Sequence, residues 1–465
     1  MLSQPRVADW AEYGDNIRRN EDSPPGYFFL VRAWSSLAGI SEVGLRSLSA
    51  LLGLLATLLF FGLARQLLPP RAAIAAAGLY AIHPFLIEIA REARPYSLLI
   101  CLSTASLWLL FRIAAGQAGL TSRLVFVAVT AALLYTHYFA LLFISAEALA
   151  LAIVWRRPSG LALFGAAGLL FLPGGLEMVR RAGDIGSGQR HIWVKVADSD
   201  WSLGAWLQAG LALPKKLLVG GVFIPDSWLG RGVLLALGLL VLVILAVAWR
   251  AWFRRDRRQA LTLAILLVAP VLATLVLDAA IGMRTIQTPR YLAFLTLPYL
   301  LLFAAAFVPE TPGHRLRWSL LILVPALFWA NFQHFREGKH GFNWAEQVRQ
   351  MEQFTGPDGV ILAEYFRDPL LVGWYLKTPR QVICGIQSPP FTRVKVLPPG
   401  TKLAYIPSGG LIWTGNPDRP IHHRLTRLVG DKVLLPRRTV TVNSRYRTVL
   451  YFQRHPSSDS LREGR

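Results

Sequence analysis

The residues best suited to chemistry lie in the stretch AREARPYSLL at Ala90–Leu99, where an apolar run breaks and then resumes. Arg91, Glu92 and Arg94 bring two cations and one acid together, and Tyr96 follows them closely. Charged groups at the edge of hydrocarbon are costly and are retained mainly where they handle a charged ligand. Arginine suits such a task because its planar guanidinium pairs with phosphate through two hydrogen bonds. The stretch therefore predicts the rim of a site for an anionic group at a bilayer surface.

The composition of the chain places these residues in a membrane protein. Of its 465 residues 54% are hydrophobic and 16% charged, and the mean hydropathy is +0.42. Apolar blocks of about 20 residues recur along the chain, which is typical of a polytopic membrane protein. The net charge of +22 comes from 49 Lys and Arg against 27 Asp and Glu. Since most of this excess lies between the apolar blocks, it favours anionic lipid and not nucleic acid as the partner.

The sequence excludes several common classes of site. Cys101 lies in an apolar block and Cys384 in the polar tail, and two cysteines are too few for a disulfide framework or a metal cluster. No HExxH, P-loop or Rossmann glycine pattern is present.

About ten apolar blocks have the length of transmembrane spans, several of them near the short limit. A short interfacial helix with Arg32 snorkelling towards water is predicted before them, at residues 26–37. The predicted spans are 43–67, 72–90, 96–112, 123–136, 138–154, 160–176, 229–249, 260–281, 291–308 and 317–334.

Lysine and arginine counts in alternate loops orient these spans. One set of loops is short, basic and nearly free of acid, which predicts the cytoplasmic side. The other set, AREARPY, residues 177–228 and MRTIQTPRY at 283–291, mixes both signs with Trp, His and Tyr, so we expect it outside. The basic set holds Arg65, Arg71, Arg112, Arg123, Arg156, Arg157, Arg250, Arg254, Arg255, Arg257, Arg258, Arg315 and Arg317.

This orientation places the polar N-terminus outside, although no signal segment precedes it. We therefore expect a further helix upstream of Met1, in a chain that is truncated or assigned the wrong start.

The tail changes character and predicts a small α/β domain on the outer face. Asn343–Phe354 has helical spacing, and Val360–Ala363, Leu403–Ile406 and the alternating stretch Thr439–Phe452 are typical of strands. The predicted fold is thus an α-helical polytopic membrane protein with an extracytoplasmic C-terminal domain. Its parts are residues 1–42 as outer loop and interfacial helix, 43–334 as transmembrane domain with the outer loop 177–228, and 335–465 as the α/β domain.

Several stretches together resemble the GT-C class of polytopic membrane glycosyltransferases. Within that class the chain is most similar to glycosyltransferase family 39, the branch of protein mannosyltransferases and aminoarabinose transferases. The resemblance covers roughly residues 20–310; its elements are individually loose, but their order and spacing make it specific. They are SPPGYFFLVRAW (23–34), SEVGLRSLSALLGLL (41–55), HPFLIEIAREARPYSLL (83–99), LYTHYFALLF (134–143), LP (172–173) and TPRYLAFLTLPYLLL (288–302).

The resemblance implies transfer of a sugar from a polyprenyl-phosphate carrier to a lipid, glycan or protein acceptor on the outer face of the cytoplasmic membrane. The family's first outer loop carries an Asp, often followed by Glu, soon after the first transmembrane helix. The given sequence begins after that point, so we expect the first helix and its acids to lie upstream of Met1. The acids left in that loop are Asp9, Glu12, Asp15, Glu21 and Asp22.

Such a transfer needs a carboxylate to take a proton from the acceptor or orient it, and cations to stabilise the departing phosphate. Asp22, directly before Ser23-Pro24-Pro25, and Glu92 are the candidate catalytic acids; an ordinary ion pair of Glu92 with Arg94 is the alternative. Acids beside phosphate are compatible with a divalent metal ion, although no ligand spacing requires one. The candidate substrate-binding residues are Arg91, Arg94, Tyr96, His137, Tyr138, Arg290 and Tyr291.

Most of these residues also have a plainer interpretation. His137 could cap a tight turn, and Arg290 with Tyr291 could anchor a helix at the interface. Glu88 is placed one helical turn before Glu92, on the same helix face, as a second acid or as the partner of Arg91. Lone acids in apolar segments are usually functional or paired, and no partner is evident for Glu147 or Asp278.

Two other functions compete with the transferase. A transporter or flippase for a lipid-linked sugar would also have many spans, but repeated halves and proline- or glycine-broken helices are expected there, and neither is evident in the sequence. A catalytically inactive, truncated member that scaffolds an envelope complex is the third reading.

Overall fold

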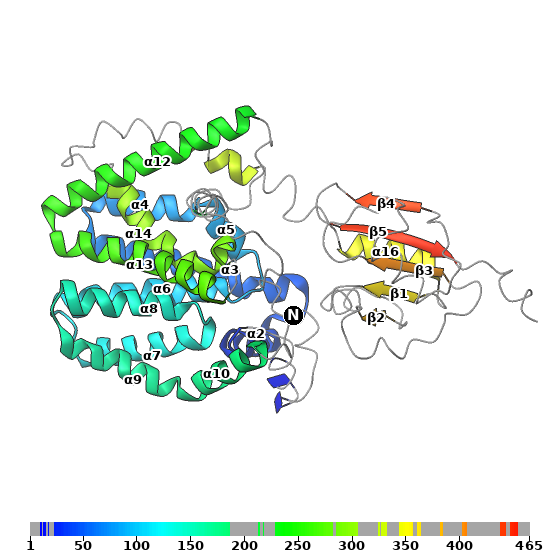
Figure 1. Cartoon of the computed structure of the whole chain (residues 1–465), viewed down its shortest axis with the longest axis horizontal. Helices are drawn as coiled ribbons and strands as arrows, with labels where there is room; N and C mark the ends of the chain where they lie inside the picture. The colour runs from blue at the N-terminus through cyan, green and yellow to red at the C-terminus, as the bar shows by residue number, and fades with distance from the viewer. Residues whose placement is uncertain are drawn as a thin grey trace, which may run out of the picture. The chain divides into compact units, whose positions relative to one another are not determined.

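The chain divides into two compact units, Asp9–His334 and a second unit that holds the C-terminal residues from Phe335 onwards. The structure is a computed structural model, and each unit is described by itself (Figure 1). The described residues of the first unit are 10, 11, 13, 14, 17, 23–186, 213, 217, 228–281, 285–305, 324, 325 and 327–332. Those of the second are 344–356, 360–363, 382–384, 402–406, 438–442 and 447–453.

The first unit is a bundle of helices in which segments distant in sequence pack side by side (Figure 1). Its first half contains α2 (Gly26–Ala38), α3 (Glu42–Leu67), α4 (Pro70–Ala81), α5 (Pro84–Ala90), α6 (Tyr96–Ala114), α7 (Leu120–Thr136) and α8 (Ala140–Leu149). α8 continues as a π-helix over Ala150–Val154, and a 3-10 turn at Pro158–Gly160 leads to α9 (Leu161–Leu170) and α10 (Leu172–Gly186). Then follow α12 (Trp228–Arg255), α13 (Arg257–Ile281), two 3-10 segments (Thr285–Gln287 and Pro289–Leu295) and α14 (Thr296–Ala305).

Local signals explain where the long helix α3 begins. The Ser41 hydroxyl accepts a hydrogen bond of 3.0 Å from the Gly44 backbone N–H, which satisfies one of the amides that a helix start leaves open. Glu42 adds negative charge in the first turn, where the helix dipole favours it. α3 then packs against α6, and Gly62 makes room for the Trp108 ring.

Three helices are long and apolar enough to cross a membrane, namely Glu42–Leu67, Tyr96–Ala114 and Arg257–Ala280. Two bent helix pairs raise this number to as many as five within the described residues. The predicted block 317–334 lies mostly outside those residues. The count of about ten spans therefore stays a prediction.

The predicted span 72–90 is broken into α4 and α5, which meet at an angle of 56°. Pro84 has no N–H to donate, and its ring disfavours helical torsions at His83, whose ψ is 118°. The Ile82 carbonyl accepts a hydrogen bond of 2.8 Å from the Asn331 side chain. The block 160–176 is likewise bent, by 63°, between the 158–170 and 172–180 segments. The expectation that the chain has no broken helices is wrong at both places.

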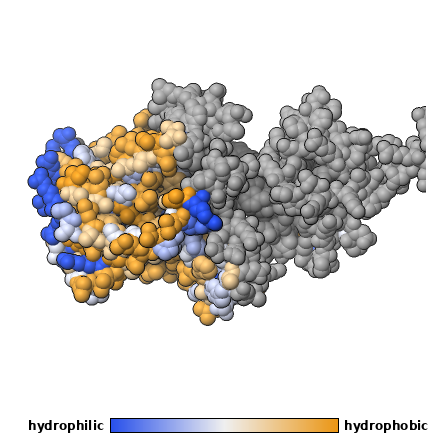
Figure 2. All heavy atoms as spheres, turned by 60° about the horizontal axis from the view of Figure 1, so that its bottom comes forward, coloured by the Kyte–Doolittle hydropathy of each residue, from blue (hydrophilic) through white to orange (hydrophobic). Residues whose placement is uncertain are grey.

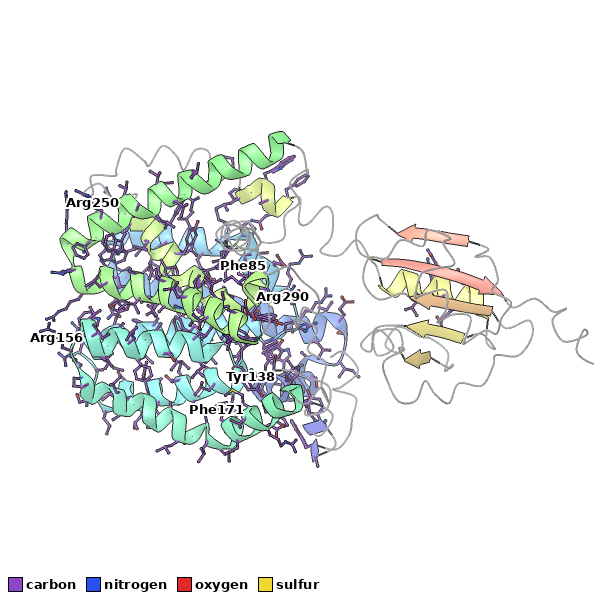
Figure 3. All side chains as sticks on the ribbon, viewed as in Figure 1. Phe85, Tyr138, Arg156, Phe171, Arg250 and Arg290 are labelled. Atoms are coloured by element: carbon purple, nitrogen blue, oxygen red, sulfur yellow. The ribbon has the colours of Figure 1, made fainter. Side chains whose placement is uncertain are left out.

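The helical unit has two polar ends and an apolar surface between them. Arg156 and Arg250 lie at one end, whereas Tyr138 and Arg290 lie at the other (Figure 3). Large apolar side chains cover much of the surface between them (Figure 2). Leu51, Leu54 and Leu58 of α3, for example, are exposed by about half their area. Such a surface suits hydrocarbon and would be unfavourable in water.

The described residues of the second unit form one helix and a five-stranded sheet. Helix α16 (Trp344–Thr355) packs against β1 (Val360–Ala363) and β3 (Lys402–Ile406). The strand order is β2-β1-β3-β5-β4, where β2 is Val382–Cys384, β4 is Arg438–Val442 and β5 is Arg447–Gln453. β1 is parallel to both its neighbours, and β5 is antiparallel to both of its own. The helix and strands expected from the tail are present, and the stretch Thr439–Phe452 holds two paired strands.

Gly26 allows α2 to pack closely against α7. A Cβ atom at Gly26 would lie 2.7 Å from the Tyr135 carbonyl oxygen, so backbone would have to shift. We expect Gly26→Ala to destabilise the protein by about 1–3 kcal/mol, as overpacking does. A thermal unfolding curve in detergent measures this effect.

Gly78 supplies the matched control, because it also lies within a helix but nothing lies within 4 Å of a Cβ placed there. Gly78→Ala is expected to be neutral or to stabilise by up to about 1 kcal/mol, through helix propensity. Equal behaviour of the two variants would contradict the close approach.

Candidate functional site

The charged stretch forms the turn between α5 and α6. α5 ends at Ala90, and the Arg94 backbone N–H donates a hydrogen bond of 2.8 Å to the Glu92 carbonyl. Arg91 is exposed, whereas Glu92 and Arg94 are half-buried. The placement of Glu88 and Glu92 on one helix face is wrong, because the helix ends before Glu92.

Arg290 comes from the 3-10 segment Pro289–Leu295 and meets this turn. Its Nη1 lies 3.8 Å from Glu92 Oε2, and the two side chains are 35% and 16% exposed. At that distance the charges attract without a direct hydrogen bond between those two atoms. The guanidinium also lies 5.7 Å from the centre of the Tyr96 ring. The structure thus brings Arg290, Glu92 and Tyr96 together, as the sequence analysis expected of one site.

The groups around Arg290 keep its guanidinium charged. Burial by itself would lower the pKa of the guanidinium, but Glu92, then Tyr96 and Glu88, raise it above its ordinary value. Glu88 therefore lies close enough to act on Arg290 although it belongs to α5. The charges of two carboxylates act on one half-buried cation, and its exposed part can receive an anion.

An aromatic cluster, Tyr96, His137, Phe139 and Tyr291, lies beside Arg290. Phe139 stacks on Tyr291 with ring centres 5.1 Å apart and planes within 15°. The His137 ring lies 5.5 Å from Tyr96 and 5.4 Å from Tyr291. Sequence reasoning missed Phe139, although it follows directly in the same THYF run. Tyr138, also predicted at the site, is half-buried at the same end of the unit (Figure 3).

His137 is a neutral turn residue in this cluster. Its Nδ1 accepts a hydrogen bond of 3.2 Å from the Phe139 backbone N–H, so in the neutral ring the proton belongs on Nε2. Burial lowers its pKa to about 4, because a charged imidazole would be poorly solvated there. The turn-capping alternative is therefore realised in the structure, and it leaves the Nε2 proton to act as a donor.

Tyr27 of α2 was not singled out from the sequence. Its hydroxyl is 2.9 Å from Ser49 Oγ, and the side chain is fully buried. Burial raises its pKa well above the usual range, while the Ser49 hydrogen bond and the charge of Arg94 act the other way. The charges of Arg94 and Glu92 both act on the pKa of this hydroxyl. The position of Tyr27 next to Pro25-Gly26 was the available signal.

Arg32 does not snorkel towards water as predicted. It is 8% exposed, and its guanidinium lies 4.4 Å from the Trp10 ring centre and 4.7 Å from that of Tyr13. Cation–π attraction and aromatic packing retain it inside the unit.

Other predicted residues lie outside the part of the chain that the structure describes. Asp22, the second candidate catalytic acid, is one of them, as are Asp9, Glu12, Asp15 and Glu21. Among the described residues there is no group of three or more His, Cys, Asp or Glu side chains that could hold a metal ion.

Comparison with known proteins concerns the fold of the chain. Residues 22–173 match the family described as dolichyl-phosphate-mannose-protein mannosyltransferase. Apo ArnT from Cupriavidus metallidurans is similar with a TM-score of 0.54 at 14% identity, over 96% of this chain and 93% of that chain. The chain has the GT-C fold of ArnT. The resemblance identified in the sequence is thus confirmed for the fold.

Two further solved structures are similar to this chain. ArnT bound to undecaprenyl phosphate is similar with a TM-score of 0.53 at 14% identity, over 92% of this chain and 88% of that chain. The Archaeoglobus fulgidus oligosaccharyltransferase tethered with an acceptor peptide has a TM-score of 0.43 at 15% identity, over 78% and 56% of the two chains. No curated protein sequence matches significantly.

The buried neutral His137 should make stability depend on pH. Its pKa is about 4 in the folded protein against about 6.5 when unfolded, so the unfolded state binds more protons between these values. Stability is therefore expected to fall as pH drops from about 6.5 towards 4.

His137→Asn retains an acceptor for the Phe139 N–H but does not titrate. We expect the melting temperature of this variant to fall less steeply over the same pH range than that of the wild type. Parallel curves for the two proteins would show that His137 is not held neutral by the fold.

Proposed function

We propose that the chain is a glycosyltransferase that moves a sugar from a polyprenyl-phosphate carrier to an acceptor on the outer face of the cytoplasmic membrane. The observation that carries the proposal is the meeting of half-buried Arg290 with Glu92 beside the aromatic cluster, at one end of an apolar helical unit. The GT-C fold and the matched mannosyltransferase family support it. The sugar class, hexose or pentose, and the acceptor class, lipid, glycan or protein, stay open.

Arg290 is proposed to hold the carrier phosphate at the rim of the site. Negative charge builds on the phosphate oxygens as the bond to the sugar breaks, and a fixed cation stabilises that charge. Arg94, in the same turn as Glu92, is the second cation, and exposed Arg91 can act as an outer contact for the headgroup. Because Arg290 is already partly desolvated, its attraction for a dianion is stronger than that of an exposed arginine.

Glu92 is proposed as the carboxylate that acts on the acceptor, with Asp22 as the second catalytic acid. A phosphate at Arg290 would take over the attraction that Glu92 now supplies, since both are anions drawn to the same guanidinium. Glu92 would then be available to accept the acceptor's proton or to orient its hydroxyl or amine. Donor binding and base activation are thereby linked through one ion pair.

The aromatic cluster is proposed to hold the sugar ring or the first isoprene unit of the donor. Tyr96 and Tyr291 offer ring faces, and neutral His137 offers the Nε2 proton to a sugar hydroxyl. Tyr138, at the same end, completes the list of proposed contacts. A neutral imidazole is the more stable hydrogen-bond donor here, because burial destabilises the charged form of the ring.

Substitution of the ion pair tests the proposal in detergent solution with polyprenyl-phosphate-linked sugars and a panel of acceptors. Arg290→Gln is expected to reduce kcat/KM by roughly a hundredfold, since one charged group that stabilises the leaving phosphate is lost. Glu92→Gln is expected to reduce kcat by roughly a hundredfold with less change in donor KM, as for a lost general base.

Arg46→Gln is the matched control, because Arg46 also pairs with a glutamate, Glu42, but on the exposed surface of α3. Its activity should stay within about twofold of the wild type, as exposed ion pairs contribute little. Transfer activity that survives Arg290→Gln undiminished would rule out the proposed phosphate site.

A transporter for a lipid-linked sugar is the second candidate function. The breaks between α4 and α5 and between the 158–170 and 172–180 segments favour it, since broken helices are common in transporters. Transport needs two compartments, whereas glycosyl transfer does not. Product formation by the detergent-solubilised chain therefore distinguishes the enzyme from the transporter.

The proposed orientation has the C-terminal unit outside and the basic loops inside. Ser460→Cys and Ser159→Cys, each in a chain whose Cys101 and Cys384 are replaced by alanine, report on the two sides. An impermeant maleimide is expected to label Ser460→Cys on intact spheroplasts and Ser159→Cys only after permeabilisation. The reverse pattern would invert the orientation.

A further inference from the structure

Asp278 is a buried acid near the end of α13, in one of the helices apolar enough to cross a membrane. Its side chain is 1% exposed. An ionisable group in such a place is costly and calls for a functional explanation. The sequence offered no partner for it, and the transfer chemistry described above does not use it.

The Asp278 carboxylate binds the start of the next segment of chain. Oδ1 accepts a hydrogen bond of 3.0 Å from the Thr285 N–H, and Oδ2 accepts one of 2.9 Å from the Ile286 N–H. These are the first amides of the 3-10 helix Thr285–Gln287, which have no partner within that helix. Hydrogen bonds from amides to a carboxylate are roughly twice as strong as those between neutral groups.

Two further hydrogen bonds connect this short helix to Arg290. The Thr288 N–H donates to the Thr285 carbonyl at 2.8 Å, and the Tyr291 N–H donates to the Thr288 carbonyl at 3.0 Å. Pro289, between them, has a restricted φ. The chain from Ile286 to Tyr291 therefore has little conformational freedom, and Asp278 holds its start.

We propose that Asp278 is a positioning residue for Arg290 and Tyr291, and that it thereby sets the affinity for the donor phosphate. It contacts no reacting atom. It anchors the segment that contains both residues. This segment places the Arg290 guanidinium near Glu92 and the Tyr291 ring in the aromatic cluster. This inference rests on the proposed function for its link to the donor, but not for the link between Asp278 and the segment.

Hydrogen exchange tests the structural link without any substrate. Asp278→Asn keeps the size of the side chain but offers the two amides one acceptor in place of two. We expect the amides of residues 285–291 to exchange at least about tenfold faster in this variant, because local opening becomes easier. Unchanged exchange would overturn the proposal.

Glu147→Gln is the matched control for the loss of a buried acid. Glu147 is fully buried in α8 and accepts a hydrogen bond of 2.7 Å from the Ser106 hydroxyl, so its substitution alters a buried acid that is not the acceptor for the Thr285 and Ile286 amides. Exchange at residues 285–291 and the donor KM should both match the wild type in this variant.

Steady-state kinetics test the link to the donor. Asp278→Asn is expected to raise the KM for the polyprenyl-phosphate sugar by about tenfold and to change kcat by less than about twofold, since only the placement of the phosphate site is altered. Should Asp278→Asn fold poorly, Asp278→Glu is the second variant; it retains the charge and should show the same changes in smaller degree.

The outcomes separate the two proposals. Faster exchange with an unchanged donor KM would overturn the positioning role. A wild-type chain that transfers no sugar would refute the proposed function and the donor link with it, while the exchange result would still show whether Asp278 holds the segment.

Discussion

The attraction between Arg290 and Glu92 joins two segments that are far apart in the sequence. One is the turn between α5 and α6, and the other is the 3-10 segment before α14. Each charge is partly withdrawn from water, and a partly buried charge is stable only where an opposite charge or a hydrogen bond compensates for the lost hydration. The proposed site depends on both segments together, because each supplies one of the two charges.

The helix break before Pro84 determines which residues take part. A continuous helix over 72–90 would carry Glu88 and the following turn in a different direction. The break turns α5 by 56° relative to α4, and the Asn331 side chain binds the Ile82 carbonyl beside it. α5 can then deliver Glu88 near Arg290 and end two residues before Glu92. The proline is therefore part of the architecture of the site.

Burial separates the charged groups of the site from the neutral ones. Arg290 and Glu92 keep contact with solvent and lie close to each other. His137 and Tyr27 are buried, and burial shifts the pKa of each further in favour of its neutral form. The result is a rim that can exchange one anion for another, next to a cluster that offers ring faces and neutral hydrogen-bond donors.

Asp278 and Glu147 illustrate two uses of a buried acid. Glu147 receives a hydroxyl hydrogen bond from Ser106 and ties α8 to α6. Asp278 receives two amide hydrogen bonds and ties α13 to the segment that carries Arg290. Asp278 is the one of these two acids that binds the segment with the proposed phosphate site.

The sequence by itself determined much of the local structure. The long apolar blocks, the charged turn at 91–95 and the helix and strands of the tail follow from composition and periodicity, which act over a few residues. The order of the motifs was enough to identify a GT-C resemblance. The candidate residues Glu92, Tyr96, His137, Arg290 and Tyr291 follow from the sequence too, because their types suit phosphate and sugar chemistry at a membrane edge.

Only the tertiary structure decided which of these residues meet. The partner of Arg290, the amides that Asp278 binds, the rings around Arg32 and the role of Phe139 all depend on contacts between distant segments. Periodicity carries no information about such contacts, since many pairings of helices bury the same apolar faces. Pro84 can be recognised in the sequence, but the bend that it makes cannot. A proline within a helix can bend or end the helix, and packing selects between the two.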